Sequence, residues 1–151
     1  RTAQQYSHYR LRFEWRWLEK GGNSGLLLHM QGEDKVWPKC LEAQLKHDNA
    51  GDFFTMEGVR FAELNAGERR VQKKAPSNEK PLGKWNKMAV EVDGSHVRVT
   101  VNGVLQNEAT ELTVDEGYIG FQSEGTPIEF RRIKLMPMRE PAATEAPARE
   151  E

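Results

Sequence analysis

The sequence predicts an all-β domain, built as a two-sheet antiparallel sandwich with few helices. Several short segments alternate apolar and polar residues with a period of two, as strands buried on one face do. The dipeptides Asp93-Gly94 and Asn102-Gly103 follow apolar runs, and such pairs favour two-residue hairpin turns. No comparably long segment repeats apolar residues every 3.6 positions. One-sided strands without intervening helices close as a sandwich or a barrel, and we favour the sandwich.

Three strands are predicted in the first third of the chain. Residues 9–17 place aromatic and leucine side chains on one side and Arg or Glu on the other. Residues 20–24 supply turn residues, and residues 26–31 form the next strand. Residues 41–46 alternate again. The apolar side of this third strand comprises Leu41, Ala43 and Leu45, and the polar side comprises Glu42, Gln44 and Lys46.

The second half of the chain contains the strongest turn signals. Residues 88–92 and 97–101 are predicted strands that meet at Asp93-Gly94, and Asn102-Gly103 turns the chain again. Residues 118–122 and 128–135 add two strands around a turn that contains Gly125 and Pro127. Five valines are expected on the buried faces of the hairpin: Val90, Val92, Val97, Val99 and Val101.

Two regions do not fit the strand pattern. Residues 48–83 are rich in Gly, Asn, Lys and Glu, and a loop this long in a compact domain favours a binding role. Residues 138–151 combine Pro, Ala and charge, which predicts a disordered tail after a sandwich domain at 1–137. The start at Arg1 has no initiator Met and no signal-peptide apolar region, so we expect an N-terminally trimmed chain.

Composition excludes several classes of protein. With 22 Lys plus Arg against 23 Asp plus Glu, no net basic field exists to hold nucleic acid. No apolar run is long enough to span a bilayer. The lone Cys40 cannot form an internal disulfide. The sequence also lacks a G-x-S-x-G elbow, a P-loop and a Rossmann glycine pattern.

Seven local signatures occur in an order that resembles the bacterial 3-keto-disaccharide hydrolase family, across roughly residues 6–136. They are YRLRFEWRW at 9–17, GNSG at 22–25, EAQ at 42–44, GKWN at 83–86, NGV at 102–104, GYIGFQ at 117–122 and IEFRRI at 128–133. This resemblance implies a concanavalin-like, jelly-roll sandwich and a secreted or periplasmic setting. It also implies that the partner is an oligosaccharide or glycoside already oxidised at the third sugar carbon.

The mechanism that this resemblance implies is elimination, because a ketone at C3 acidifies the proton on C2. A base removes that proton, the C1 substituent leaves, and water then adds to the unsaturated ketone. Strand parity and the matched segments nominate Glu42 as the base, with His29 or Glu124 as the proton donor. The family often has arginine at the position of His29. The predicted substrate-binding residues are Arg16, Gln44, Gln122 and Trp37, of which all but Trp37 are expected on one concave sheet face.

Other interpretations of these residues stay open. Outward side chains of any sandwich are polar because they face water. His47, Asp48, Asn49 and Asp52 offer metal ligands close in sequence but match no fixed spacing, so the sequence identifies no cofactor and leaves a divalent metal as an alternative. The same architecture also serves non-catalytic glycan-binding modules and interaction domains, so fold by itself does not select catalysis.

Overall fold

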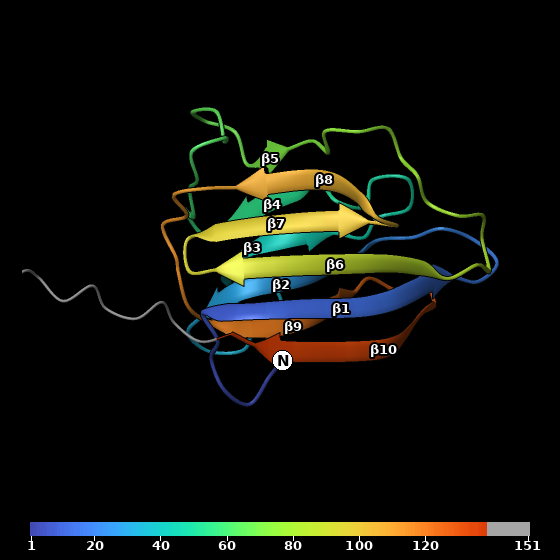
Figure 1. Cartoon of the computed structure of the whole chain (residues 1–151), viewed down its shortest axis with the longest axis horizontal. Helices are drawn as coiled ribbons and strands as arrows, with labels where there is room; N and C mark the ends of the chain where they lie inside the picture. Colours follow the sequence, from blue (N-terminus) through green and yellow to red (C-terminus); the bar gives the residue numbers. More distant parts are fainter. Residues whose placement is uncertain (139–151) are drawn as a thin grey trace, which may run out of the picture.

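The computed structural model describes residues 1–138, which form two five-stranded antiparallel sheets packed face to face (Figure 1). The first sheet has the order β10-β1-β6-β7-β8 and the second the order β5-β4-β3-β2-β9. The predicted two-sheet sandwich is therefore confirmed. No helix occurs in residues 1–138, so none there is long and apolar enough to cross a membrane.

The strands of the first sheet are β1 (His8–Trp17), β6 (Asn86–Asp93), β7 (His96–Val101), β8 (Val104–Ala109) and β10 (Ile128–Pro137). Those of the second are β2 (Ser24–Gln31), β3 (Lys39–Gln44), β4 (Phe53–Met56), β5 (Arg70–Val71) and β9 (Tyr118–Ser123). In Figure 1 the first sheet lies in front of the second, with β8 and β5 toward one edge and β10 and β9 toward the other.

The main hydrophobic core fills the space between the sheets. Strand β1 contributes five buried aromatic or leucine residues, of which Tyr9 and Trp15 have no exposed surface. The second sheet contributes Leu26, Leu41 and Phe53, which are also fully buried. The five valines predicted for the hairpin all belong to this core. Burial of these period-two apolar faces is the main stabilising force of the sandwich.

The two predicted hairpins are present, one of them shifted by a residue. Val101 pairs with Val104, so Asn102 and Gly103 form the turn, both with positive φ, at 47° and 83°. Asp93 pairs with His96, so the first turn is residues 94–95 rather than Asp93-Gly94. The paired Asp93 accepts a hydrogen bond from the His8 ring across the sheet, which keeps it in the strand.

The region 48–83 contains two strands that the pattern did not predict, β4 and β5. The four residues of β4 begin with two adjacent phenylalanines and do not alternate cleanly, and β5 is only two residues long. The pattern likewise does not predict strand β8, although the Asn102-Gly103 turn requires a partner strand after it. The predicted tail at 138–151 lies, apart from Met138, outside the described residues.

A β-bulge in β2 changes which way His29 points. The register of β2 with both neighbours shifts between Leu27 and Gln31, and His29 has a φ of 52°. The extra residue lets Leu28 and His29 both face the interior, while Met30 returns to the outer face with Leu27. Strand parity alone therefore fails beyond Leu28.

Candidate functional site

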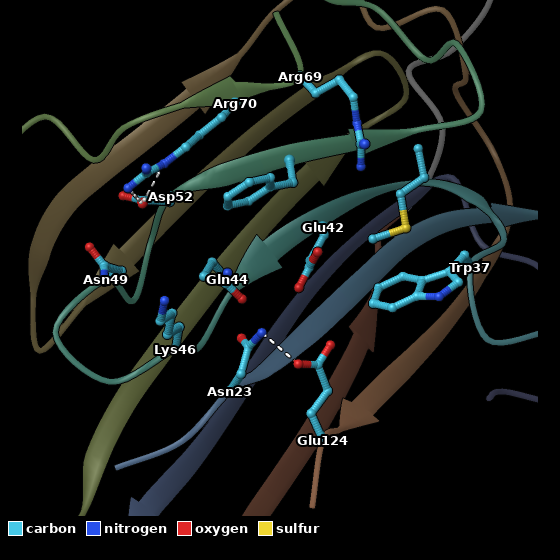
Figure 2. Close-up of a pocket in the computed structure, with 12 residues that line it drawn as sticks. Asn23, Trp37, Glu42, Gln44, Lys46, Asn49, Asp52, Arg69, Arg70 and Glu124 are labelled. Atoms are coloured by element: carbon cyan, nitrogen blue, oxygen red, sulfur yellow. Dashed lines mark hydrogen bonds and ion pairs between the residues drawn. The ribbon is translucent and has the colours of Figure 1, made fainter.

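A cavity of about 350 Å³ lies on the outer face of the second sheet (Figure 2). Strand β3 supplies Glu42 and Gln44 to its floor, and strand β4 supplies Phe54 and Met56. The surrounding loops, with the edge strand β5, supply Asn23, Trp37, Lys46, Asn49, Asp52, Arg69, Arg70 and Glu124. Half of the lining residues come from region 48–83, whose binding role stays a prediction.

A glycine makes room for the carboxylate at the centre of this floor. Gly25 on β2 pairs with Gln44 on one side and with Gln122 of β9 on the other. A Cβ added at Gly25 would overlap the carboxylate of Glu42. Because Gly25 has no side chain, the Glu42 side chain can pack directly on the β2 backbone, and Glu42 is only 5% exposed.

Burial changes the acidity of Glu42. The pKa of this carboxyl is raised from 4.5 to about 7, first by loss of hydration and second by the nearby Glu124 carboxylate. The Arg69 guanidinium acts in the opposite direction and lowers the pKa. Figure 2 shows Arg69 reaching into the cavity from the side opposite Glu124. Glu42 is thus a carboxylate that can accept and release a proton near neutrality.

A chain of hydrogen bonds connects Glu42 and Glu124, two of the three carboxylates that line the cavity. With its amide nitrogen turned toward the acceptors, Gln44 donates to Glu42 Oε1 at 3.1 Å and to Asn23 Oδ1 at 3.1 Å. Asn23 Nδ2 donates to Glu124 Oε2 at 2.7 Å, and Gln122 Nε2 donates to Glu124 Oε1 at 2.8 Å. Each donor fixes the orientation of the next acceptor, so the polar floor is ordered before any ligand binds.

Part of the rim is fixed by an ion pair. Arg70 donates to Asp52 Oδ2 at 2.6 Å, and the backbone of Lys73 donates to Asp52 Oδ1 at 2.8 Å. Both oxygens of Asp52 are therefore engaged. Within residues 1–138 no group of three or more His, Cys, Asp or Glu side chains is arranged to hold a metal ion.

An apolar cluster adjoins the polar floor on the same face. It consists of Leu27, Met30, Cys40 and Met56, with Tyr118 packed against it. The Trp37 ring lies at this end of the cavity, beyond Glu42 in Figure 2, and 53% of the residue is exposed. The cavity therefore has a hydrogen-bonding half and an apolar half, a combination typical of small-molecule sites.

Most of the predicted site residues meet here. Glu42, Gln44, Trp37 and Glu124 line the cavity. Gln122 lies beside it, bonded to Glu124 on the same sheet. Their proximity is a fact of the structure, and their roles remain predictions.

The placement predicted for Arg16 is wrong. Arg16 belongs to β1 in the first sheet, whereas Glu42 belongs to the second. Its guanidinium bonds Glu129 at 2.7–2.8 Å and lies 4.6 Å from the centre of the Trp85 ring. Strand parity correctly turned Arg16 away from the core, but parity does not say which sheet a strand joins.

The placement predicted for His29 is also wrong. The bulge in β2 buries the ring completely between the sheets, where its Nε2 donates to the carbonyl of Gly94 at 2.8 Å. Burial lowers the pKa of His29, so the ring is neutral at pH 7. His29 links β2 to the β6–β7 turn and does not reach the cavity.

Sequence reasoning missed Arg69, and for Asn23 it favoured a turn role over ligand contact. Arg69 precedes a two-residue strand in a region without periodicity, and its only signal was membership of the predicted binding loop. Asn23 directly precedes Ser24 in the GNSG motif, and this position predicts a place at the end of a strand. The motif carries no information about Glu124, which is 101 residues away and accepts a hydrogen bond from Asn23.

Comparison with solved structures shows the same fold at low sequence identity. A "Putative glycosyl hydrolase" from Parabacteroides distasonis aligns with a TM-score of 0.71 and 20% identity, over 91% of this chain and 81% of that one. The carbohydrate-binding module CBM66 from Bacillus subtilis aligns with a TM-score of 0.64 and 14% identity, over 89% and 78%. Galectin LEC-6 from Caenorhabditis elegans aligns with a TM-score of 0.53 and 15% identity, over 89% and 91%.

No curated protein sequence matches the chain. A family model described as a 3-keto-alpha-glucoside-1,2-lyase-like domain matches residues 1–136. This match spans both sheets except for the last residue of β10, and it includes every residue of the cavity. The chain therefore belongs to the 3-keto-alpha-glucoside-1,2-lyase-like domain family, a group of carbohydrate-related, hydrolase-like β-sandwiches.

Proposed function

We propose that this protein cleaves 3-keto-glycosides by elimination followed by hydration, in the cavity around Glu42. The observation that carries the proposal is the buried Glu42 carboxylate, whose pKa of about 7 suits a general base at neutral pH. The family description names a 1,2-lyase, and elimination across C1 and C2 is the corresponding reaction.

In this reaction Glu42 takes the proton from C2, and the electron pair of that C–H bond is delocalised onto the C3 ketone oxygen as an enolate. Arg69 lies across the cavity and supplies a positive charge for this oxygen. The electrons then return to form the C1=C2 double bond while the C1–O bond breaks. Water adds across this bond, with hydroxide at C1 and a proton at C2.

The departing oxygen needs a proton, which we assign to Glu124. Of the two donors considered from the sequence, Glu124 lines the cavity and His29 does not. In this step Glu42 starts ionised and Glu124 starts protonated, and elimination reverses the two states. During hydration Glu124 takes a proton from the attacking water and Glu42 returns one to C2, which restores the starting pair. Gln44 is a positioning residue, because its amide holds Glu42 and Asn23 in one hydrogen-bonded chain that ends at Glu124.

The apolar half of the cavity offers a binding surface for the leaving group of the glycoside. A sugar ring presents an apolar face of C–H groups that stacks on an exposed indole, and Trp37 offers one beside the polar floor. We place the keto sugar over Glu42 and the leaving group toward Trp37 and Met56.

The test is steady-state turnover of 3-keto-glucosides by Glu42→Gln. The amide keeps the shape and the hydrogen bond from Gln44 but removes the base, so we expect kcat to fall by about 100- to 10,000-fold with sugar affinity retained. Glu124→Gln should lose activity mainly on poor leaving groups, because activated ones depart without a proton. Glu129→Gln is the matched control, since Glu129 lies on the first sheet with Arg16. Near-normal activity of Glu42→Gln removes Glu42 from the role of base.

A glycan-binding module is the second candidate function. It is favoured by the exposed Trp37 next to a prearranged polar floor, a combination that binds sugar without requiring a base. Calorimetric affinity for glycosides in an unmutated protein that turns over no 3-keto-glycoside would select this function over catalysis.

A further inference from the structure

A second hollow, of about 360 Å³, lies on the outer face of the first sheet, on the other side of the sandwich from Glu42. Four cationic residues line it: Arg12, Lys87, Arg132 and Lys134. Glu14 is the one carboxylate among the lining residues. The protein as a whole carries a formal net charge of −1, so this surface is a local concentration of positive charge and not part of a general basic surface.

The single carboxylate of the hollow is already engaged. Glu14 Oε1 accepts a hydrogen bond from Arg131 at 3.1 Å, and Glu14 Oε2 accepts one from Arg132 at 3.2 Å. A bulge in β10 makes this double contact, because the register shifts between Arg12 and Glu14 and Arg132 has a φ of 52°. Glu14 is therefore paired with Arg131 and Arg132, and it forms no ion pair with Arg12, Lys87 or Lys134.

Arg12 and Lys134 face each other without a counter-charge, whereas Lys87 on β6 is opposite Glu14 on β1 with no ion pair between them. Arg12 on β1 is directly opposite Lys134 on β10, and like charges in a cross-strand pair destabilise a sheet. Among residues 1–138, no carboxylate forms an ion pair with Arg12, Lys87 or Lys134. Other cations on this face are paired: Arg10 with Glu91, and Arg16 with Glu129. Arg98 on β7 also lacks an ion pair within residues 1–138 but lies outside the hollow, so three of the four unpaired cations of this face line it.

We propose that this hollow binds an anionic polysaccharide that carries sulfate or carboxylate groups on successive sugars. Its cations come from the neighbouring strands β10, β1 and β6, which spreads the charge over about 10 Å at ordinary strand spacing. A chain with charges along its length matches this spread better than one small anion does. The ligand supplies the counter-charge that Arg12 and Lys134 lack.

Two other polyanions fit the hollow less well. The aromatic residue in its lining, Phe13, is only 2% exposed, so no ring is available to stack on nucleobases. Met88 in the floor is 1% exposed, so no large apolar side chain of the lining can insert into a lipid surface. The floor between the cations is formed by the small residues Ala89 and Thr100.

The experiment measures the affinity of the full chain for dextran sulfate and for polygalacturonate, with neutral dextran as the reference polymer. We expect binding to one or both charged polymers that weakens with added salt, and none to dextran. The double variant Arg12→Gln/Lys134→Gln should weaken binding by about tenfold or more. It should leave the melting temperature equal or higher, because a like-charge pair is removed.

The matched control is Arg10→Gln/Arg98→Gln, which removes the same charge from the same face outside the hollow. Retained binding in this control supports the proposal. An equal loss in both double variants would show that binding reflects diffuse charge and overturns it. So would the absence of binding to either charged polysaccharide, or equally tight binding to mixed-sequence double-stranded DNA or to phosphatidylglycerol vesicles. Activity at Glu42 is not part of the readout, so this result is independent of the proposed reaction.

Discussion

At the scale of single residues, the site depends on how Glu42 is held among charges of opposite sign. Burial and Glu124 favour its protonated form, whereas Arg69 favours the carboxylate. Arg69 reaches across the cavity from the position just before β5, and Gly25 leaves the space that the Glu42 side chain fills. The acid–base properties of Glu42 therefore depend on Arg69 and Gly25, which are both distant from Glu42 in the sequence.

Arg69→Gln should affect both the rate and the pH profile. Loss of the charge that stabilises the enolate is expected to lower kcat about 100-fold. Because Arg69 lowers the pKa of Glu42, its removal should also move the acidic limb of kcat/KM to higher pH. The measurement is kcat/KM between pH 5 and 9 for wild type and variant, a range of roughly two units on either side of the expected midpoint. Arg69→Lys should restore the pH midpoint more than the rate, and an unshifted midpoint in Arg69→Gln contradicts the assignment.

His29→Gln tests the reassignment of His29 from donor to structural link. Loss of the hydrogen bond to Gly94 should lower the free energy of unfolding by about 1–3 kcal/mol. Activity of the folded variant should stay within about twofold of wild type. The lowered pKa of the buried ring means that the wild type loses this contribution as pH falls below the unfolded value of about 6.5. Chemical denaturation at pH 7.5 and 5.5 checks the stability, and a selective loss of activity on poor leaving groups would return His29 to catalysis.

At the scale of elements, the β7–β8 hairpin also holds the long loop before β6. Asn102 in the turn accepts from the backbone of Lys87 at 2.8 Å, and its amide donates to Asn86 Oδ1 at 3.0 Å and to the carbonyl of Asn78 at 3.1 Å. One side chain thus joins the turn, the start of β6 and residues 78–80 of the loop, where Lys80 also bonds Asn86. The β-turn and the loop are expected to lose order together.

Asn102→Ala should lower the free energy of unfolding by about 2 kcal/mol. The substitution removes three hydrogen bonds. It also places alanine at a φ of 47°, a left-handed conformation that asparagine tolerates better because its side chain can form local hydrogen bonds. Urea denaturation followed by tryptophan fluorescence gives the value. Asn65→Ala is the matched control on an exposed turn, and it should change stability by no more than about 0.5 kcal/mol. Equal effects of the two changes would show that the Asn102 contacts contribute nothing specific.

At the scale of the whole molecule, the sandwich places its two polar hollows on opposite outer faces, with one shared core between them. The Glu42 site is built at a cost to stability, because a carboxylate is held where its charged form is poorly hydrated. Because the pKa of Glu42 is raised, this cost to the free energy of unfolding increases as the pH rises and the carboxyl ionises.

Glu42→Gln should therefore stabilise the fold at alkaline pH. Since the pKa of Glu42 is about 7 when folded and 4.5 ordinarily, its contribution is fully present below about pH 4.5 and is lost as pH rises through 7. We expect the variant to exceed wild type by on the order of 1–3 kcal/mol at pH 8, with the difference shrinking toward pH 5. Thermal and urea unfolding across this range measure it. A variant that is less stable than wild type at pH 8 contradicts the burial of a titrating carboxyl.

The sequence by itself determined the features that depend on neighbouring residues. Alternation along residues 9–17 and 41–46 identified β1 and β3 and their buried faces, and Asn102-Gly103 identified a hairpin, because side-chain period and turn torsions are local properties. The matched EAQ segment likewise placed Glu42 and Gln44 on one polar face.

Only the tertiary structure decided which of these polar faces meet. It separated Arg16 from Glu42 by assigning β1 and β3 to different sheets, and the bulge in β2 turned His29 inward. It also brought Arg69 across from Glu42 through a strand too short to be recognised. Strand pairing and bulges are selected by the free energy of packing residues that are distant in sequence, and a period of two carries no information about that choice.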